Sequence, residues 1–261
     1  EVESFCKYME STSLNKKISS VEVQSKTVLT KNLSPGLLQA KLKSCRFLSV
    51  KGYGKYLFAE SNKGDFLVMH FGMTGYLNYY KDFDEATRFI RMQINFENGY
   101  HLAYDDGRKL GRIYLADDFI QFIKKKRLGV DPIREKINYS RFKEILIGKK
   151  GSVKTLLMNQ AVLAGIGNIY SDEILFQSNI HPNSLINKIK EKDLKEIFKK
   201  MKEILNKAIK VNSDWEKISD KFLIHYRRPG KDCPVCSGKI KRSTIGGRSS
   251  YYCNKHQRII N

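Results

Sequence analysis

Two short pairs of metal-binding residues near the end of the chain constrain its fold more than any other feature. Cys233 and Cys236 form the pair C-P-V-C, and after sixteen intervening residues Cys253 and His256 form the pair C-N-K-H. Three thiolates and one imidazole at this spacing supply the four ligands of a tetrahedral Zn²⁺ site. We therefore expect one structural zinc ion here. The alternative is a reduced, metal-free tail in which His256 is a coincidence.

The segment between the two pairs predicts a β-hairpin. Gly238, Gly246 and Gly247 separate short β-prone pieces, and such a hairpin is too small to bury a core without metal. Cys6 and Cys45 are expected to be ordinary apolar filling. The chain has five cysteines and opens with no charged-then-apolar leader, which argues against a disulfide framework.

The stretch from Lys154 to Pro182 predicts a helix, a glycine turn and a second helix. The turn is Gly165-Ile166-Gly167-Asn168, and its glycines would let the backbone approach a phosphate at the start of the second helix. An αα-hairpin whose glycines only pack two helices is the alternative, and spacing alone favours neither. The residues with helical spacing are Leu156, Leu157, Gln160 and Leu163 before the turn, and Ile169, Asp172, Glu173, Ile174 and Leu175 after it.

The charge of the chain favours phosphate binding. Its 261 residues contain 48 Lys and Arg against 27 Asp and Glu, a formal net charge of +21. This surplus predicts attraction to a polyanion, most commonly nucleic acid, although a general lysine bias of the proteome would also produce it. No run of 18 apolar residues occurs, so we expect an intracellular protein of the cytoplasm or nucleoid, without a membrane span.

Hydrophobic patterns divide the chain into a β-rich first part and a helical second part. Residues 1–14 predict a helix, and residues 20–120 alternate like strands, with a hairpin turn at Asn98-Gly99. Helices are expected from about 139 to 211. The predicted class is α+β. Its predicted domains are an N-terminal helix plus antiparallel β-sandwich (1–127), a helical domain carrying the glycine turn (128–221) and a β-hairpin zinc finger (222–261).

This order of parts resembles the formamidopyrimidine-DNA glycosylase and endonuclease VIII family of base-excision repair enzymes, over essentially the whole chain. Residues 154–182 look like the family's helix–two-turn–helix element, and residues 233–257 look like its zinc finger. Shorter matching pieces, which are weak singly but strong together and in order, are Glu1-Val2-Glu3, Gly54-Lys55-Tyr56-Leu57, His70-Phe71-Gly72-Met73-Thr74-Gly75, Tyr104-Asp105-Asp106-Gly107-Arg108 and Leu128-Gly129-Val130-Asp131-Pro132.

The resemblance implies a DNA glycosylase that is also an abasic-site lyase. Such enzymes flip a damaged base out of the duplex, and an N-terminal proline amine attacks C1′ of its nucleotide to form a Schiff base. The strand then breaks by β,δ-elimination, with a neighbouring glutamate assisting proton transfers. The implied partner is double-stranded DNA with a damaged base or an abasic site. The implied cofactor is the one structural Zn²⁺, and a monomer is expected.

The resemblance also assigns roles to individual residues. Lys55 would face the phosphate or sugar near the lesion, although a surface lysine on a hairpin is the alternative. Met73, Arg108 and Leu110 would enter the gap left by the flipped base. Leu110 stands where the family usually has phenylalanine, and core packing is the alternative for Met73. The contacts to phosphates or to the lesion would come from His70, Lys154, Gly167, Asn168 and Arg248, with a buried histidine as the alternative for His70.

Three features depart from the family pattern. The chain begins at Glu1, where the family has a short stretch starting Pro-Glu, so the nucleophilic proline and its glutamate are absent; the uncapped first helix favours a missing start over lost chemistry. His256 replaces the usual fourth cysteine, which zinc tolerates. Only Asn212–His225 joins the long helix to the finger, where 8-oxoguanine-specialised members have a longer loop. This favours oxidised pyrimidines or ring-opened purines as substrates.

Two other functions stay open at this point. One is a non-catalytic protein on the same fold that binds lesions or abasic sites. The other is a zinc-ribbon nucleic-acid module of transcription or RNA metabolism, which would show no preference for damaged duplex.

Overall fold

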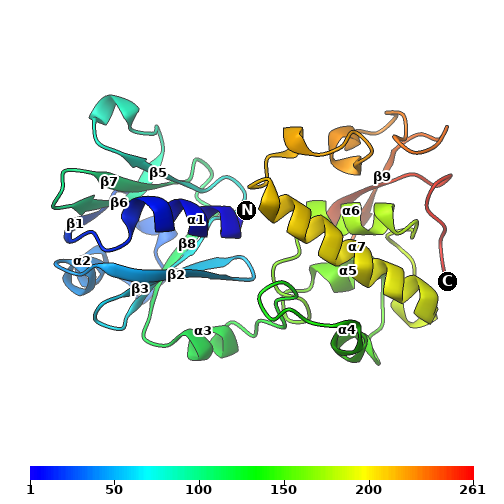
Figure 1. Cartoon of the computed structure of the whole chain (residues 1–261), viewed down its shortest axis with the longest axis horizontal. Helices are drawn as coiled ribbons and strands as arrows, with labels where there is room; N and C mark the ends of the chain where they lie inside the picture. Colours follow the sequence, from blue (N-terminus) through cyan, green and yellow to red (C-terminus); the bar gives the residue numbers. More distant parts are fainter. The chain divides into compact units, whose positions relative to one another are not determined.

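The computed structural model describes residues 1–261, except for the side chain of Phe83. The chain forms two compact units, unit 1 (Glu1–Lys126) and unit 2 (Arg127–Asn261), each with its own hydrophobic core (Figure 1). No helix among the described residues combines the length and the hydropathy of a membrane span.

Unit 1 is an antiparallel β-sandwich with a helix packed on it, which confirms the predicted class. One four-stranded sheet has the order β1-β6-β7-β5 and the other the order β2-β3-β4-β8. The strands are β1 (Ile18–Val23), β2 (Phe47–Tyr53), β3 (Tyr56–Ser61), β4 (Phe66–His70), β5 (Tyr76–Tyr80), β6 (Ile90–Phe96), β7 (His101–Asp105) and β8 (Arg112–Ala116). Helix α1 (Val2–Ser13) packs Cys6 and Met9 against the shared core, which also holds Cys45.

Helix α2 (Pro35–Leu42) lies in a region for which the sequence pattern predicts strands alone, and that expectation is wrong here. Ser34 starts the helix because its hydroxyl accepts a hydrogen bond from the Leu37 N–H, and proline fits the first helical turn. Helix α3 (Phe119–Lys125) ends unit 1. The predicted turn between β6 and β7 is confirmed, and Gly99 has the positive φ of +81° that such turns require.

Unit 2 is helical and ends in the predicted β-hairpin. Its helices are α4 (Tyr139–Leu146), α5 (Val153–Met158), α6 (Asn168–Gln177) and α7 (Glu191–Lys210), and the hairpin consists of β9 (Lys241–Ile245) and β10 (Arg248–Tyr252). One face of α7 enters the core through Ile197, Met201 and Ile204. Gly246 and Gly247, both with positive φ, form the two-residue hairpin turn.

Helix α5 is shorter than the sequence pattern predicts. It ends at Met158, so Gln160 and Leu163 lie in turns and not on a continued helix. The Gln160 amide donates to the carbonyl oxygens of Met158 and Ile166, each at 2.8 Å, and its oxygen accepts from the Gly165 N–H at 3.0 Å. The side chain of Gln160 therefore braces the glycine turn, and its helical spacing is misleading.

Glu173 of α6 holds the segment that joins α7 to the hairpin. Its buried carboxylate accepts hydrogen bonds from Gln177 and from the backbone N–H groups of Leu223 and Ile224, at the start of the short 3₁₀ helix η5 (Leu223–Tyr226). Burial raises the pKa of Glu173 to about 7, and these hydrogen bonds oppose the rise.

This raised pKa makes the stability of unit 2 depend on pH. The folded protein binds the Glu173 proton more tightly than the unfolded chain, so the contribution is full below the unfolded pKa of 4.5 and is lost as pH rises through the folded value. We expect the free energy of unfolding to fall by about 3 kcal/mol over this range and Glu173→Gln to remove that dependence. Chemical denaturation at several pH values measures it. Glu196→Gln on α7 is the control, and an unaltered pH profile in Glu173→Gln would contradict the assignment.

Gly111 in unit 1 leaves room for the buried side chain of Tyr104, whose hydroxyl donates to the His70 carbonyl oxygen at 2.9 Å. A Cβ at position 111 would lie 1.6 Å from the Tyr104 hydroxyl oxygen. We expect Gly111→Ala to lower the free energy of unfolding by about 2–4 kcal/mol, from overpacking and the lost hydrogen bond. Gly36→Ala, where an added Cβ meets no atom within 4 Å, is the control in the same denaturation experiment. Equal stability of the two variants would refute this packing argument.

Candidate nucleic-acid interface

Two loops of unit 1, after β4 and after β7, bring three predicted contact residues together. A Cβ on Gly72 would lie 2.7 Å from the backbone carbonyl carbon of Leu110, so the two loops touch. Met73 is 69% exposed and Leu110 is 43% exposed, and the Arg108 guanidinium lies 3.7 Å from the Met73 sulfur. Met73 is therefore not a core residue. A thioether, a guanidinium and an isobutyl group share one exposed surface, which we call the Met73–Arg108–Leu110 surface.

Asp106 holds these two loops in place from below. Its buried carboxylate accepts hydrogen bonds from the Thr74 hydroxyl at 2.9 Å, the Arg108 N–H at 3.2 Å and the Gly111 N–H at 2.7 Å. Three donors from both loops thus converge on one anion, which fixes the loop geometry. Sequence reasoning missed this role. The available signal was the Asp106-Gly107 pair, a common turn former.

Lys55 and His70 lie close together at one end of the second sheet. Lys55 is half-buried in the turn between β2 and β3, and Tyr56 beside it pairs with His70. Burial lowers the pKa of His70, and the charge of Lys55 adds to this effect, so the imidazole is neutral at pH 7. His70 Nδ1 accepts from the Gly72 N–H at 3.2 Å, which leaves Nε2–H as a donor. The Lys55 ammonium group and the neutral His70 imidazole are therefore two hydrogen-bond donors in the same region of unit 1.

The first turn of α1 packs against the strand that leads to Lys55. A Cβ on Gly52 would lie 3.2 Å from the Val2 side chain and 3.5 Å from the Glu3 carboxylate. The start of α1 and the Lys55 turn thus belong to one region of unit 1.

The glycine turn of unit 2 leads directly into α6. Gly165 has a φ of +103°, a conformation that favours glycine, and Gly167 is the N-cap residue. Asn168 begins the helix, and its side-chain oxygen has no hydrogen-bond partner among the described residues. The first N–H groups of a helix lack intrahelical partners and attract anions, so this turn can bind a phosphate.

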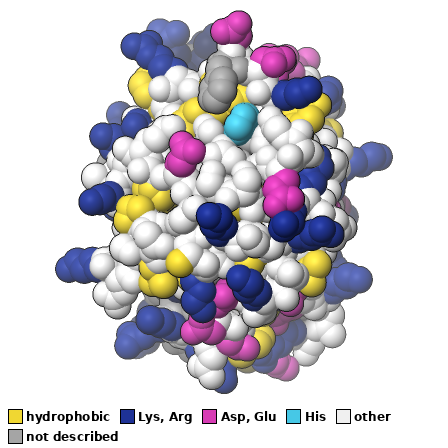
Figure 2. All heavy atoms as spheres, turned by 90° about the vertical axis from the view of Figure 1, so that its left-hand side faces the viewer, with side chains coloured by type: hydrophobic (Ala, Val, Ile, Leu, Met, Phe, Trp, Pro, Cys, Tyr) yellow, Lys and Arg dark blue, Asp and Glu magenta, His cyan; other side chains and the backbone are white. Residues whose placement is uncertain are grey.

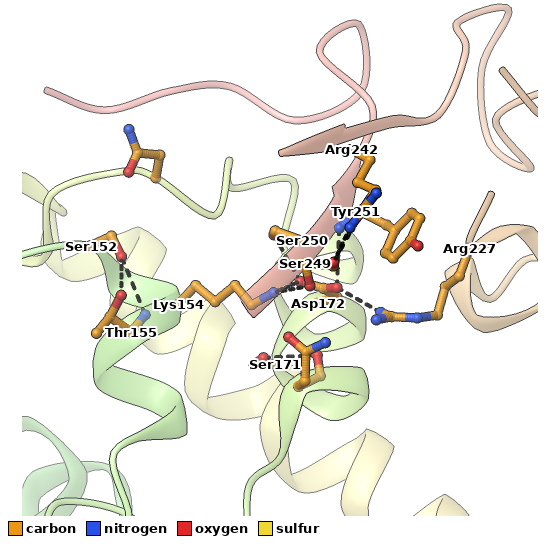
Figure 3. A network of polar contacts seen from close by, with 12 residues as sticks. Ser152, Lys154, Thr155, Ser171, Asp172, Arg227, Arg242, Ser249, Ser250 and Tyr251 are labelled. Carbon is orange, nitrogen blue, oxygen red and sulfur yellow. Dashed lines mark hydrogen bonds and ion pairs between the residues drawn. The ribbon is translucent and has the colours of Figure 1, made fainter. Parts of the chain in front are cut away.

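Lys154 lies inside unit 2, where α5, α6 and the hairpin meet (Figure 3). Its side chain is 0% exposed, and its Nζ lies 2.6 Å from Asp172 Oδ1 and donates to the Ser249 carbonyl oxygen at 3.1 Å. Burial lowers the pKa of Lys154, and the Asp172 charge opposes this. The expectation that Lys154 contacts a phosphate does not fit this geometry, because the ammonium group is enclosed by protein and already bonded.

Arg248 is exposed at the tip of the hairpin, as its predicted role requires. It is the first residue of β10 and pairs with Ile245 across the Gly246-Gly247 turn. A Cβ on Gly246 would lie 2.8 Å from the Thr155 hydroxyl oxygen, so the hairpin tip rests on α5.

Three of the four predicted metal ligands converge. The Sγ atoms of Cys233, Cys236 and Cys253 lie within 4.8 Å of one another, and these residues can hold a metal ion. Gly238 fits against this cluster because a Cβ there would lie 2.6 Å from Cys253 Sγ. His256 lies outside the sulfur cluster, and its Nε2 is 3.0 Å from the Phe176 carbonyl oxygen.

The positive charge of the chain is not gathered into one patch on the face of the molecule that Figure 2 shows. Lys and Arg side chains are spread over the described part of this face, with acidic and hydrophobic side chains between them (Figure 2). Net charge alone therefore does not locate a binding surface on this face.

Comparisons with known proteins agree with the two-unit architecture. Residues 1–113 match the model of the formamidopyrimidine-DNA glycosylase N-terminal domain, and residues 128–220 match that of the formamidopyrimidine-DNA glycosylase H2TH domain. The chain is 31% identical to a Mycoplasma genitalium formamidopyrimidine-DNA glycosylase, over 99% of this chain and 95% of that protein. It is 32% identical to the Pelotomaculum thermopropionicum protein of the same name, over 99% and 98%.

Solved structures are similar along the same length. The Lactococcus lactis Fpg bound to DNA with an abasic site superposes with a TM-score of 0.88 at 26% identity, covering 99% of this chain and 98% of that one. The same enzyme bound to DNA containing FAPY-dG also gives a TM-score of 0.88, over 98% of both chains. Sequence and fold together establish that this chain belongs to the formamidopyrimidine-DNA glycosylase family.

Proposed function

We propose that this protein is a DNA repair glycosylase that excises oxidised bases from duplex DNA and also cleaves the strand at the resulting abasic site. The Met73–Arg108–Leu110 surface carries the proposal. These three side chains lie at loop tips, where the hydrophobic core of the protein does not need them. A flipped nucleotide leaves a gap in the duplex, and these side chains can fill it. The relatives bound to abasic-site and FAPY-dG DNA support this substrate class.

The three side chains suit different parts of that gap. Met73 is flexible and apolar and fills irregular space between bases. The planar Arg108 guanidinium can donate several hydrogen bonds to the unpaired base of the opposite strand. Leu110 is a smaller wedge than the aromatic residue usual in the family. Phosphate contacts come from His70 Nε2–H, from the turn at Gly167 and Asn168, and from Arg248.

The covalent step in this proposal uses an N-terminal proline amine carried by residues ahead of Glu1. Attack of the amine on C1′ expels the base, which leaves with the amine proton. The C1′–O4′ bond of the sugar then opens to give a Schiff base, and the neighbouring glutamate supplies the proton that O4′ takes up. The Schiff base acidifies the neighbouring sugar protons and permits β,δ-elimination. Lys55 faces the sugar or phosphate and stabilises negative charge there. The contact of Val2 and Glu3 with Gly52 supports this arrangement, because residues ahead of Glu1 then start close to strand β2, which leads into the Lys55 turn.

The proposed ligands of one Zn²⁺ are Cys233, Cys236, Cys253 and His256. The Cys236 and Cys253 sulfurs lie 3.7 Å apart, as two thiolates on one tetrahedral ion would. His256 donates its Nε2 proton to the Phe176 carbonyl oxygen, a bond typical of zinc-bound histidine, and this leaves Nδ1 as the metal-binding nitrogen. When bound, zinc supplies folding free energy to the finger and takes no part in the reaction.

Borohydride trapping tests the enzymatic proposal. The protein with its native start is incubated with duplexes that carry an abasic site, 8-oxoguanine, a ring-opened purine or an oxidised pyrimidine. We expect a covalent adduct with the abasic site and with at least one lesion, because reduction fixes the Schiff base. A protein that binds these duplexes but gives no adduct is a lesion-binding protein. Equal binding of damaged and undamaged duplex excludes both functions.

Lysine variants refine this test. Lys55→Ala should lower the rate of strand cleavage by roughly tenfold or more, the equivalent of one lost charge-assisted hydrogen bond. Lys63 stands in the next turn of the same sheet and is exposed, so Lys63→Ala is the matched control. Equal rates for the two variants would remove Lys55 from the proposed site.

Metal removal tests the zinc site independently of catalysis. We expect one zinc ion per chain, lost on chelation together with the protection of the hairpin amides from hydrogen exchange, and restored by added Zn²⁺. His256→Gln should weaken zinc retention, and His225→Gln, which bonds the Ile218 carbonyl oxygen, should not. A metal-free protein with intact hairpin protection and DNA affinity would overturn this assignment.

A further inference from the structure

One buried carboxylate joins the glycine-turn helices of unit 2 to the hairpin (Figure 3). Asp172 Oδ1 lies 2.6 Å from Lys154 Nζ and accepts from the Ser250 hydroxyl at 3.0 Å. Asp172 Oδ2 accepts from the Arg227 guanidinium at 2.6 Å and from the Tyr251 N–H at 3.1 Å. Four donors from three segments of the chain therefore meet on one side chain of α6.

Strand β10 is held at three consecutive positions by this arrangement. Lys154 bonds the carbonyl oxygen of Ser249, and Asp172 bonds the side chain of Ser250 and the backbone of Tyr251. These residues with Arg227 form the Asp172 network. The side chains of Lys154 and Asp172 are both 0% exposed, and Ser250 is buried as well. The other members of the network, Arg227, Ser249 and Tyr251, are partly exposed.

The network lies between two groups that would grip phosphates. Arg248 directly precedes Ser249 on β10, and Asn168 lies one helical turn before Asp172 on α6. The position of the hairpin relative to α6 therefore determines how far the Arg248 backbone lies from the glycine turn. Gly246, whose absent Cβ makes room for Thr155, allows the tip to approach α5 this closely.

We infer that Asp172 is a positioning residue for DNA binding. It acts through β10 and fixes the position of Arg248 relative to the glycine turn at Asn168. Lys154 is part of the Asp172 network, because its ammonium group pairs with Asp172 inside the protein and does not contact DNA. The inference rests on the proposed function, since it gives Arg248 and Asn168 the phosphates that the proposal assigns to them. Binding geometry is thereby built into the free protein.

The first experiment measures the network without DNA. Hydrogen exchange of the amides in β9 and β10 is compared between wild type, Asp172→Asn and Asp193→Asn, all zinc-loaded. Asp193 is the matched control because it is also largely enclosed and paired, with Arg258 on another segment of unit 2. We expect faster exchange at residues 248–252 in Asp172→Asn alone. Unchanged exchange there, with zinc content and thermal unfolding as in wild type, would overturn the inference.

The second experiment asks whether Asp172 acts through Arg248. Binding to a duplex is measured at several salt concentrations for Asp172→Asn, Arg248→Ala and the double variant. We expect each single variant to lower the slope of log K against log salt by about one, the loss of one phosphate contact. The double variant should match Arg248→Ala in slope and affinity. Losses that simply add would show that Asp172 has no specific link to Arg248 and overturn the inference.

Two safeguards keep these outcomes distinct. If Asp172→Asn does not fold, Ser250→Ala removes only the hydroxyl bond to Asp172 and should change exchange and slope in the same direction by a smaller amount. Phosphate contacts are independent of sequence and damage, so the cycle is run on undamaged duplex as well. Absence of lesion preference in the wild type then counts against the proposed function alone, while the slopes still test Asp172.

Discussion

The ion pair between Lys154 and Asp172 is the interaction on which unit 2 depends. Breaking a fully buried pair by removing one partner destabilises a protein by about 3–5 kcal/mol, because a charge is left in a low-dielectric interior. Replacing such a pair by apolar residues of similar volume is often neutral. Net stability is therefore a weak reason for this pair. Hydrogen bonds are directional and apolar contacts are not. Asp172 also bonds Ser250, Tyr251 and Arg227, and these bonds fix the positions of the segments that they join.

Unit 1 uses the same solution in a different setting. Asp106 is buried beneath the Met73–Arg108–Leu110 surface and receives donors from both loops that form it. In each unit a set of exposed side chains is attached to backbone that a buried aspartate fixes. A side chain such as that of arginine loses about 2 kcal/mol of conformational freedom when it is immobilised, and an ordered backbone adds nothing further to that loss. Rigid support beneath flexible contact residues thus favours binding.

Much of this architecture follows from local sequence. The cluster of three cysteines, the glycine hairpin and the amphipathic stripe of the long helix are predicted from local spacing, and the structure confirms them. The fourth predicted ligand, His256, lies outside that cluster. Local pattern fails where a polar side chain finds its partner far along the chain. Gln160 has helical spacing but bonds the glycine turn, and Asp172 fits the second helix by its spacing but bonds Lys154 of the first. Their partners lie in segments that only the fold brings near, so spacing carries no trace of these bonds.

Lys154 shows the limit of the family resemblance as well. Lys154 lies in the first turn of α5, and the family resemblance implies that it contacts a phosphate. The residues around it in the sequence are equally compatible with a buried ion pair. Its burial follows from the hairpin, which closes over α5 because Gly246 lacks a side chain and Ser249 offers a carbonyl oxygen. Lys154 and Arg227 both bond Asp172, so neither of these two charges is available to DNA. Scattered surface lysines raise the rate of encounter with a polyanion over about a Debye length. Register on the duplex is set instead by the few groups whose backbone is held, and in unit 2 that backbone is held by Asp172.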